Sequence, residues 1–118
     1  MRAHICLVLP ILVAACAAMP GPAPSGSVTL YKYAGSKQCA QGGGLSPAVA
    51  ERDLRREYVS VSRAECGTDG RTYASSCGMP DGRIVIVEVP AAQVESTRRF
   101  GYKPLTELPE ARPTPCPP

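Results

Sequence analysis

The chain has 118 residues, with 13 Lys and Arg against 10 Asp and Glu and a formal net charge of +3. This length allows one small domain. The positive charge is weak and scattered along the sequence, whereas a nucleic-acid-binding surface needs clustered lysines and arginines. Composition and charge therefore exclude a nucleic-acid partner.

The first segment has the order of a secretory signal, which is a charge, an apolar stretch and then small residues. Arg2 supplies the charge, and residues 5–13 are apolar apart from Pro10. This stretch is far shorter than the roughly 20 residues of a membrane-spanning helix. We therefore expect residues 1–15 to be a cleaved signal peptide and the mature protein to have no transmembrane helix.

The residues Val13-Ala14-Ala15-Cys16 resemble the lipobox of bacterial lipoproteins. The resemblance implies that Cys16 carries a diacylglyceryl group on its sulfur, begins the mature protein and is acylated on its amine. More than one acyl chain is needed, because a single chain anchors a protein only marginally. The implied location is the bacterial cell envelope, anchored by lipid and facing the periplasm, with ordinary secretion as the alternative. Ala17 is not the Asp that retains some enteric lipoproteins in the inner membrane, which favours the outer membrane.

Cleavage before Cys16 limits the chemistry that remains. His4, which is the only histidine, leaves with the signal together with Cys6. Without histidine the mature chain has neither a Ser–His or Cys–His nucleophile nor a histidine metal site. There is no Cys-x-x-Cys pair for zinc, and the glycines at 42–44 lack the Gly-Lys-Ser/Thr ending of a phosphate loop. We therefore expect no enzyme, no catalytic residue, no cofactor or metal site and no small-molecule substrate.

Two proline-rich segments flank the part of the chain that can fold. Residues 16–26 contain three prolines and several small residues, which predicts an extended tether. Residues 106–118 are expected to form a disordered, proline-rich tail. The domain is expected at residues 27–105, where so small a core is marginal without disulfides, which an exported compartment permits.

The first half of this domain predicts a strand, a helix and a second strand. Residues 28–33 are rich in β-branched and aromatic side chains, which is typical of a strand. Ser46 followed by Pro47 predicts the start of a helix that runs to about Glu57. Residues 58–64 alternate apolar and polar side chains, which predicts a half-buried strand.

The second half predicts a buried strand and a second helix. Residues 83–89 are apolar on both faces, which indicates a central strand covered on both sides. Pro90 opens a helix that continues to about Phe100, and Gly101 fits its C-terminal cap. The predicted fold is α+β, a small β-α-β-β-α sandwich of a three-stranded sheet and two helices stapled by a disulfide. The first two strands run parallel because a helix joins them.

This topology brings Cys39, Cys66 and Cys77 to one end of the sheet, since the first two follow parallel strands and the third precedes the returning strand. We expect one disulfide within this set. Cys66–Cys77 is the local pair, and Cys39–Cys77 stays open as an alternative. Cys116 lies in the proline-rich tail and is expected to be dispensable for folding.

Residues 66–77 resemble the central signature of Kazal-type protease inhibitors, Cys-Gly-Ser/Thr-Asp-Gly-x-Thr-Tyr-x-Asn-x-Cys. Spacing and nearly every residue type match, although Ser75 replaces the usual Asn. Within the stretch, Asp69-Gly70 predicts a turn, because Gly accepts a positive φ. The resemblance implies an inhibitor of serine proteases. It also implies a Cys39–Cys77 disulfide and a bond from Cys66 to a later cysteine, which here is only Cys116.

The rest of the chain departs from that family. No cysteine stands between Cys77 and Cys116, and Gly78, Pro80 and Gly82 would break the helix that the family has at this point. The primary expectation is therefore a non-enzymatic interaction or structural domain that meets the membrane through lipid on Cys16 and has a protein partner in the envelope. Kazal-like protease inhibition is the alternative.

Overall fold

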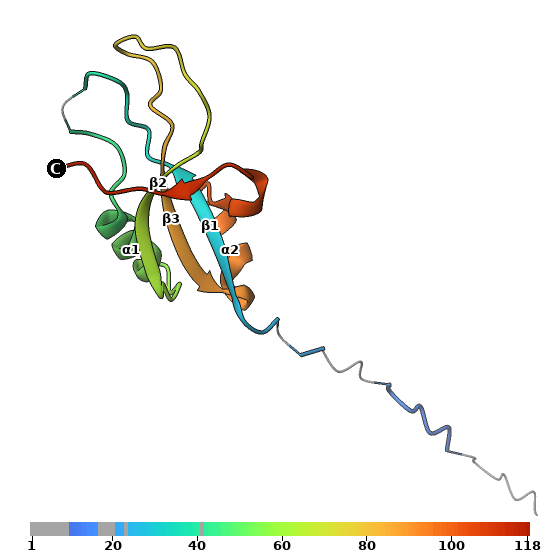
Figure 1. The fold of residues 1–118 in the computed structure, drawn as a ribbon. Helices are drawn as coiled ribbons and strands as arrows, with labels where there is room; N and C mark the ends of the chain where they lie inside the picture. The colour runs from blue at the N-terminus through green and yellow to red at the C-terminus, as the bar shows by residue number, and fades with distance from the viewer. Residues whose placement is uncertain (1–9, 17–20, 23, 41) are drawn as a thin grey trace, which may run out of the picture.

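The computed structural model describes residues 10–16, 21–22, 24–40 and 42–118. Its folded part is a five-stranded sheet with strand order β4-β1-β3-β2-β5 and two short helices (Figure 1). Every pair of neighbouring strands is antiparallel. The elements in chain order are β1 (Ser27–Tyr33), α1 (Pro47–Arg56), β2 (Arg63–Thr68), β3 (Arg83–Pro90), the 3-10 turn η1 (Ala91–Gln93), α2 (Val94–Arg98), β4 (Lys103–Pro104), the 3-10 turn η2 (Leu105–Glu107) and β5 (Arg112–Pro113).

Strand β3 is the centre of the sheet, as its doubly apolar sequence predicts. It pairs with β1 on one side and with β2 on the other. Because both neighbours are antiparallel to β3, β1 and β2 run in the same direction, which confirms the expectation for strands joined by a helix. The apolar side chains of Ile84, Val85, Ile86, Val87 and Val89 are all buried.

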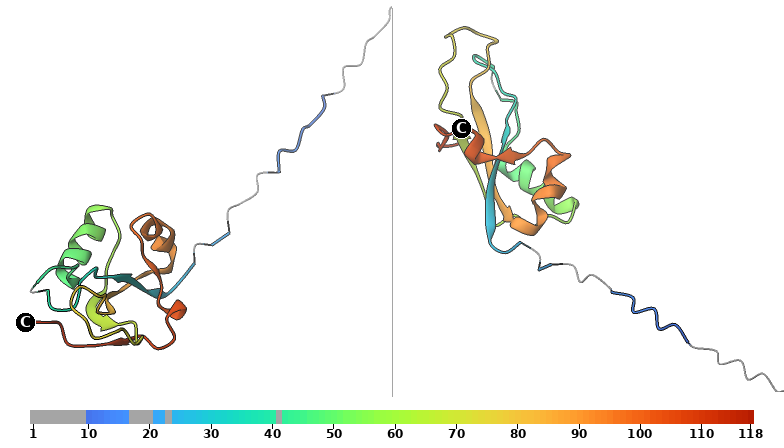
Figure 2. Two further views of the ribbon diagram at one scale, coloured as in Figure 1. Left: turned by 90° about the horizontal axis from the view of Figure 1, so that it is seen from above. Right: turned by 90° about the vertical axis from the view of Figure 1, so that its right-hand side faces the viewer.

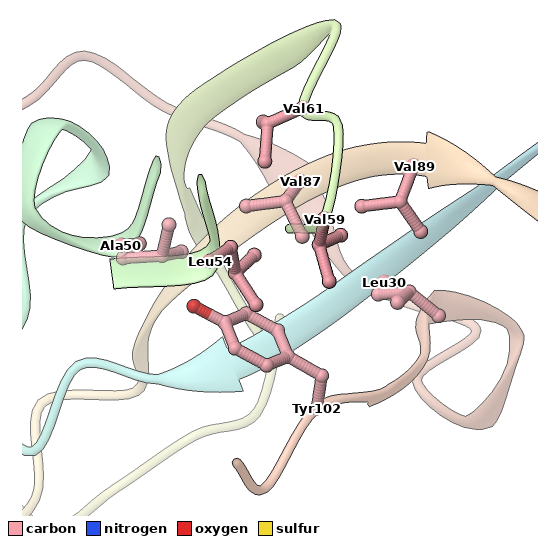
Figure 3. Packing of buried hydrophobic residues seen from close by; sticks show 9 residues of the cluster. Leu30, Ala50, Leu54, Val59, Val61, Val87, Val89 and Tyr102 are labelled. Carbon is pink, nitrogen blue, oxygen red and sulfur yellow. The ribbon is translucent and has the colours of Figure 1, made fainter. Parts of the chain in front are cut away.

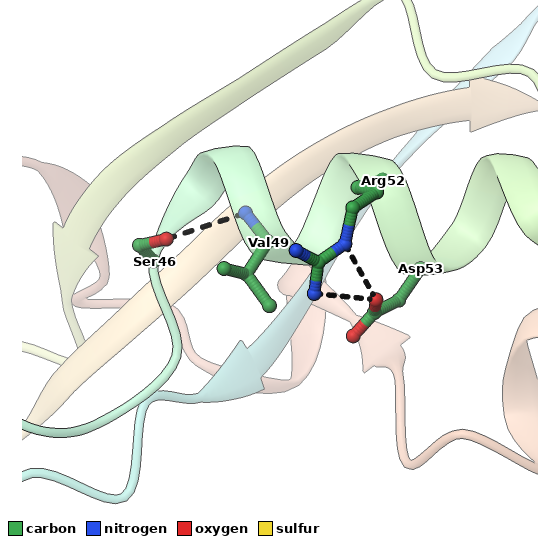
Figure 4. Close-up of polar contacts among 4 residues, drawn as sticks. All are labelled: Ser46, Val49, Arg52 and Asp53. Atoms are coloured by element: carbon green, nitrogen blue, oxygen red, sulfur yellow. Dashed lines mark hydrogen bonds and ion pairs between the residues drawn. The ribbon is translucent and has the colours of Figure 1, made fainter.

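Both helices cover one face of the sheet (Figure 2). Helix α1 begins where the sequence predicts, with Pro47 as its first residue and the Ser46 Oγ accepting a hydrogen bond from the Val49 N–H at 3.2 Å (Figure 4). Its buried side chains, Ala50 and Leu54, pack into the larger core cluster (Figure 3). The other buried members of this cluster are Leu30, Val59, Val61, Val85, Val87, Val89 and Tyr102.

Residues 105–111 cover the opposite face. Strand β4 pairs with β1 at one edge of the sheet, and β5 pairs with β2 at the other edge. Residues 105–111 therefore cross the sheet from edge to edge (Figure 2). The smaller buried cluster on this face consists of Tyr31, Ile84, Ile86 and Leu108. We call residues 103–116 the C-terminal strap.

The predicted three-stranded β-α-β-β-α sandwich is wrong, because β4 and β5 extend the sheet to five strands. These strands lie at the end of the chain, where prolines predicted a domain boundary at residue 105 and a disordered tail. Pro104 and Pro113 stand on the two outermost strands. An edge strand tolerates proline, since the missing N–H removes no bond between central strands. The proline content is therefore compatible with the strap.

The second strand also begins later than predicted. The sequence indicated a strand over residues 58–64, whereas β2 starts at Arg63. Tyr58 has a φ of +61°, which turns the chain after α1. Val59 and Val61 are buried in the larger cluster without belonging to a strand. Their alternation with polar residues therefore reflects packing against the helix layer.

We expect Ile86→Ala to lower the free energy of unfolding by about 2–5 kcal/mol, because it removes buried methylenes and leaves a cavity. Ile86 is 1% exposed, and a Cβ atom at Gly67 would lie only 2.6 Å from its Cδ1 atom. Urea denaturation of the oxidised protein measures the change. Arg52→Ala on the exposed side of α1 is the control and should stay within about 0.5 kcal/mol of the parent. Equal stability of the two variants would contradict the central position of β3.

Candidate functional site

The structure contains two disulfides, Cys39–Cys77 and Cys66–Cys116, with Cα–Cα distances of 5.1 and 5.2 Å. One bond forms within the predicted set of three cysteines, as the Cys39–Cys77 alternative. The local pair Cys66–Cys77 is absent, and Cys116, which the sequence predicted to be dispensable for folding, is bonded to Cys66. It fastens the end of the C-terminal strap to β2, because Cys66 lies in that strand.

Two loops leave the sheet at the ends of β1 and β2 and rise side by side at the same end of the molecule (Figure 1). We call residues 34–40 and 69–82 the paired loops. The Cys39–Cys77 disulfide joins them, and both of its cysteines are exposed. Cys39 has a φ of +66°, a left-handed conformation that few residues other than glycine adopt. The disulfide therefore fixes an irregular segment that lies outside the five-stranded sheet, next to the isolated bridge between Lys37 and Pro80.

Gln38 is the second connection between the paired loops. Its side-chain N–H groups donate to the carbonyl oxygens of Ala74 at 2.8 Å and Pro80 at 3.2 Å, and its Oε1 accepts from the Ser76 N–H at 3.1 Å. Its backbone N–H donates to the Met79 carbonyl oxygen at 2.9 Å. One side chain thus satisfies three backbone groups of the opposite loop, which makes the paired loops one unit.

Asp69 fixes the base of the second loop. The residue is 1% exposed, and its carboxylate accepts hydrogen bonds from the Tyr33 hydroxyl at 3.0 Å, from the Arg71 N–H at 2.9 Å and from the Tyr73 hydroxyl. Burial alone raises the pKa of Asp69, but the hydrogen bonds from Tyr73, Arg71 and Tyr33 outweigh it, and the pKa lies below the ordinary value. The carboxylate is therefore ionised at neutral pH.

The same contacts keep the two tyrosines neutral. The hydrogen bond to Asp69, helped by burial, raises the pKa of Tyr73 to about 12. Burial, followed by the hydrogen bond to Asp69, raises the pKa of Tyr33. Gly82 closes the cluster with a φ of +74°, and a Cβ atom there would lie 2.8 Å from both the Asp69 Oδ1 and the Tyr73 ring. The cluster therefore consists of two protonated hydroxyls that donate to one ionised carboxylate.

A groove of about 420 Å³ opens between the paired loops, beside this cluster. Tyr33 and Tyr73 form part of its lining, together with the cationic side chains of Lys37, Arg71 and Arg83. The one other charged residue in the lining, Asp81, lies 3.6 Å from the Arg83 guanidinium. The groove is thus a positively charged depression with aromatic side chains, open to solvent at the end of the domain.

The remaining predicted site residue, Cys16, lies in the described segment 10–16, which contains neither helix nor strand. Its thiol is exposed and forms no disulfide with another described cysteine. The predicted signal peptide and tether fall partly outside the described residues. Within the part of the chain that the structure describes, no helix is long and apolar enough to cross a membrane.

Comparisons with protein families, curated proteins and solved structures found no match for this chain. In the described ranges, no three His, Cys, Asp or Glu side chains gather into a group that could hold a metal ion. The sequence marked Asp69-Gly70 as a turn but missed the cluster that Asp69 forms with Tyr33 and Tyr73. The Asp-Gly pair was the one sequence signal for a structured turn at this position. No local pattern could indicate that Tyr33, which is 36 residues away, would contact Asp69.

Asp69→Asn tests the cluster through the pH dependence of stability. At pH 7 the substitution should lower the free energy of unfolding by about 1.5–3 kcal/mol, because hydrogen bonds to a charged acceptor are lost. The pKa of Asp69 is lowered in the folded protein relative to its ordinary value of 3.8. Its contribution is therefore complete above that value and disappears as the pH falls through the lower, folded-state pKa. Urea denaturation should show the gap between the parent and Asp69→Asn narrowing below about pH 4.

The matched control is Asp53→Asn, because the Asp53 side chain is 53% exposed and pairs with the neighbouring Arg52 on the surface of α1 (Figure 4). This change should have an effect of less than about 0.5 kcal/mol at neutral pH. A gap for Asp69→Asn that stays constant down to acidic pH would show that the pKa of Asp69 is not lowered in the folded protein.

Proposed function

We propose that this protein is a lipoprotein of the bacterial cell envelope, anchored through Cys16, whose domain binds a protein partner through the paired loops. The observation that carries the proposal is that the N-terminal entry of the chain and the paired loops lie at opposite ends of the domain. The chain enters the sheet at Ser27, at one end of β1, and the paired loops stand at the opposite end (Figure 1). An anchor that precedes β1 therefore leaves the loops facing away from the membrane.

The point at which the chain enters the domain is fixed by a backbone hydrogen bond. The Gly26 carbonyl oxygen accepts a hydrogen bond from the Ala91 N–H at 2.9 Å, next to the end of β3. Residues 17–26 separate Cys16 from β1, and ten residues span at most about 36 Å. A lipid on Cys16 would thus keep the domain near the bilayer with its loops outward.

The paired loops also have the rigidity that binding requires. The Cys39–Cys77 disulfide, the Gln38 hydrogen bonds and the Asp69 cluster hold them before any partner arrives. Loops ordered in advance lose less conformational entropy on association, so more of the interaction energy appears as affinity. Loops on a rigid scaffold are also the usual carriers of binding function. A non-catalytic binding role fits these properties.

Site-specific photocrosslinking in cells tests the binding role. A photoreactive side chain at Met79, which is 40% exposed on the second loop, should give a discrete crosslinked protein. The control position is Tyr58, which is 92% exposed between α1 and β2 at the end of the sheet away from the paired loops. The proposal requires crosslinking from Met79 without the same product from Tyr58. Absence of a product from Met79, or the same product from both positions, would contradict it.

Cys16→Ser tests the anchor separately. We expect the variant to lose acyl labelling and to move from the membrane fraction to the soluble exported fraction, because the sulfur that receives the diacylglyceryl group is gone. Fractionation with metabolic labelling by a fatty acid measures both effects. Cys39→Ser is the control, since it also replaces a cysteine but breaks only the Cys39–Cys77 disulfide and leaves the proposed anchor in place. Labelling that persists in Cys16→Ser would refute the lipidation site.

A second candidate, a Kazal-like inhibitor of serine proteases, is favoured by the disulfide pairing. The resemblance of residues 66–77 to that family implies the bonds Cys39–Cys77 and Cys66–Cys116, and these are the two bonds in the structure. The fold around them differs, since residues after Cys77 lead into β3 without a helix. Titration of a trypsin-like protease decides the matter. Stoichiometric inhibition that is lost in a Cys39→Ser, Cys77→Ser double variant would support the inhibitor, and full protease activity at molar excess would reject it.

A further inference from the structure

The groove between the paired loops has cations that the domain leaves without partners. Lys37 and Arg71 both line it, and no carboxylate of a described residue lies within ion-pair distance of either. Arg83 has Asp81 as its partner at 3.6 Å. Five arginines elsewhere in the domain are paired with neighbouring acids: Arg52 with Asp53, Arg55 with Glu51, Arg63 with Glu88, Arg98 with Glu95 and Arg99 with Glu57. Arg56 and Arg112 have no ion pair among the described residues, but neither lines the groove.

The buried carboxylate beneath the groove does not reverse this charge. Asp69 accepts hydrogen bonds from three donors and is buried away from solvent. The three cations still outnumber the two carboxylates Asp69 and Asp81. A ligand that enters the groove therefore meets positive charge and the rings of two neutral tyrosines.

We propose that this groove binds an acidic segment of the protein partner, with carboxylates against Lys37 and Arg71 and apolar side chains against the rings of Tyr33 and Tyr73. The inference rests on the proposed function and names the chemistry of that partner. Guanidinium groups pair with carboxylates in a fixed, two-pronged geometry, and aromatic rings supply apolar contact area. The groove combines both groups at the end of the domain that the anchor leaves free.

Two other anionic ligands fit the groove less well. A lipid headgroup is disfavoured because the proposed anchor precedes β1, where the chain enters the domain opposite the paired loops (Figure 1). An acidic polysaccharide needs hydrogen-bonding side chains for its hydroxyl groups. Both tyrosine hydroxyls donate to Asp69, and the Gln38 amide is engaged by the backbone of the second loop. The Ser36 hydroxyl lines the groove without a hydrogen-bond partner, but its oxygen is buried. The groups left over, cations and ring surfaces, suit a peptide with acidic and apolar side chains.

The first experiment repeats the crosslinking from Met79 in charge-reversal variants. Arg71→Glu and Lys37→Glu should each reduce the yield of crosslinked partner by about fivefold, the effect of losing roughly 1 kcal/mol. Arg52→Glu on α1 is the matched control and should leave the yield unchanged. Arg71→Gln, which removes charge without adding an acid, should give a smaller loss in the same direction. A urea midpoint equal to that of the parent would show that the variants remain folded.

The outcomes separate this inference from the proposed function. Loss of the product in Arg71→Glu and Lys37→Glu but not in Arg52→Glu supports the acidic segment. Normal crosslinking in all of these variants overturns the inference while the binding role of the paired loops stands. Absence of any product from Met79 in the parent protein removes the proposed function itself.

The second experiment identifies the class of anion. The full chain, labelled with ¹⁵N and with its disulfides formed, is titrated with a short peptide of alternating glutamate and leucine and with the same peptide carrying glutamine instead. Amide shifts confined to the paired loops with the glutamate peptide, absent with the glutamine peptide and suppressed by salt, support the proposal. Shifts in the groove with an anionic polysaccharide or with phosphatidylglycerol vesicles, but not with the glutamate peptide, overturn it, as does the absence of shifts with all of these probes.

Discussion

Strand β3 has apolar side chains on both faces, and both faces must be buried for the fold to be stable. The arrangement of the other elements depends on this constraint. One face carries Val85, Val87 and Val89, and the two helices cover it. The other face carries Ile84 and Ile86, which would meet water if the chain ended after α2. The C-terminal strap supplies the missing layer, so that a segment rich in proline becomes part of the core.

The strap has little backbone pairing of its own, and the disulfides compensate for this. Strands β4 and β5 each have two residues, and the Cys66–Cys116 bond reinforces the short pairing of β5 with β2 at the end of the strap. Closing a loop of 50 residues stabilises the folded state by about 4 kcal/mol in the chain-entropy model. The Cys39–Cys77 bond does the same for the paired loops, which have no layer over them. Each disulfide thus stands where hydrophobic packing is weakest.

The sequence predicted the elements whose signals are local. Ser46 and Pro47 located the start of α1, and the two-sided apolar run located β3 as the central strand. The strap escaped prediction because its prolines are tolerated on edge strands, a property that depends on where the strands lie in the sheet. The Asp69 cluster escaped for a related reason, since Tyr33 comes near Asp69 only once β1 and β2 flank β3. The pairing of the cysteines likewise depended on the path of the strap, which carries Cys116 back to β2.

The two-sided cover of β3 is tested most directly at Leu108, which is 4% exposed in the strap and packs with Ile84 and Ile86. The measurement is the free energy of unfolding of Leu108→Ala by urea denaturation of the oxidised protein. A strap that forms the second apolar layer predicts a loss of about 2–5 kcal/mol, as for other buried leucines. A change within about 0.5 kcal/mol, which is the effect expected for a residue in a disordered tail, would contradict the account.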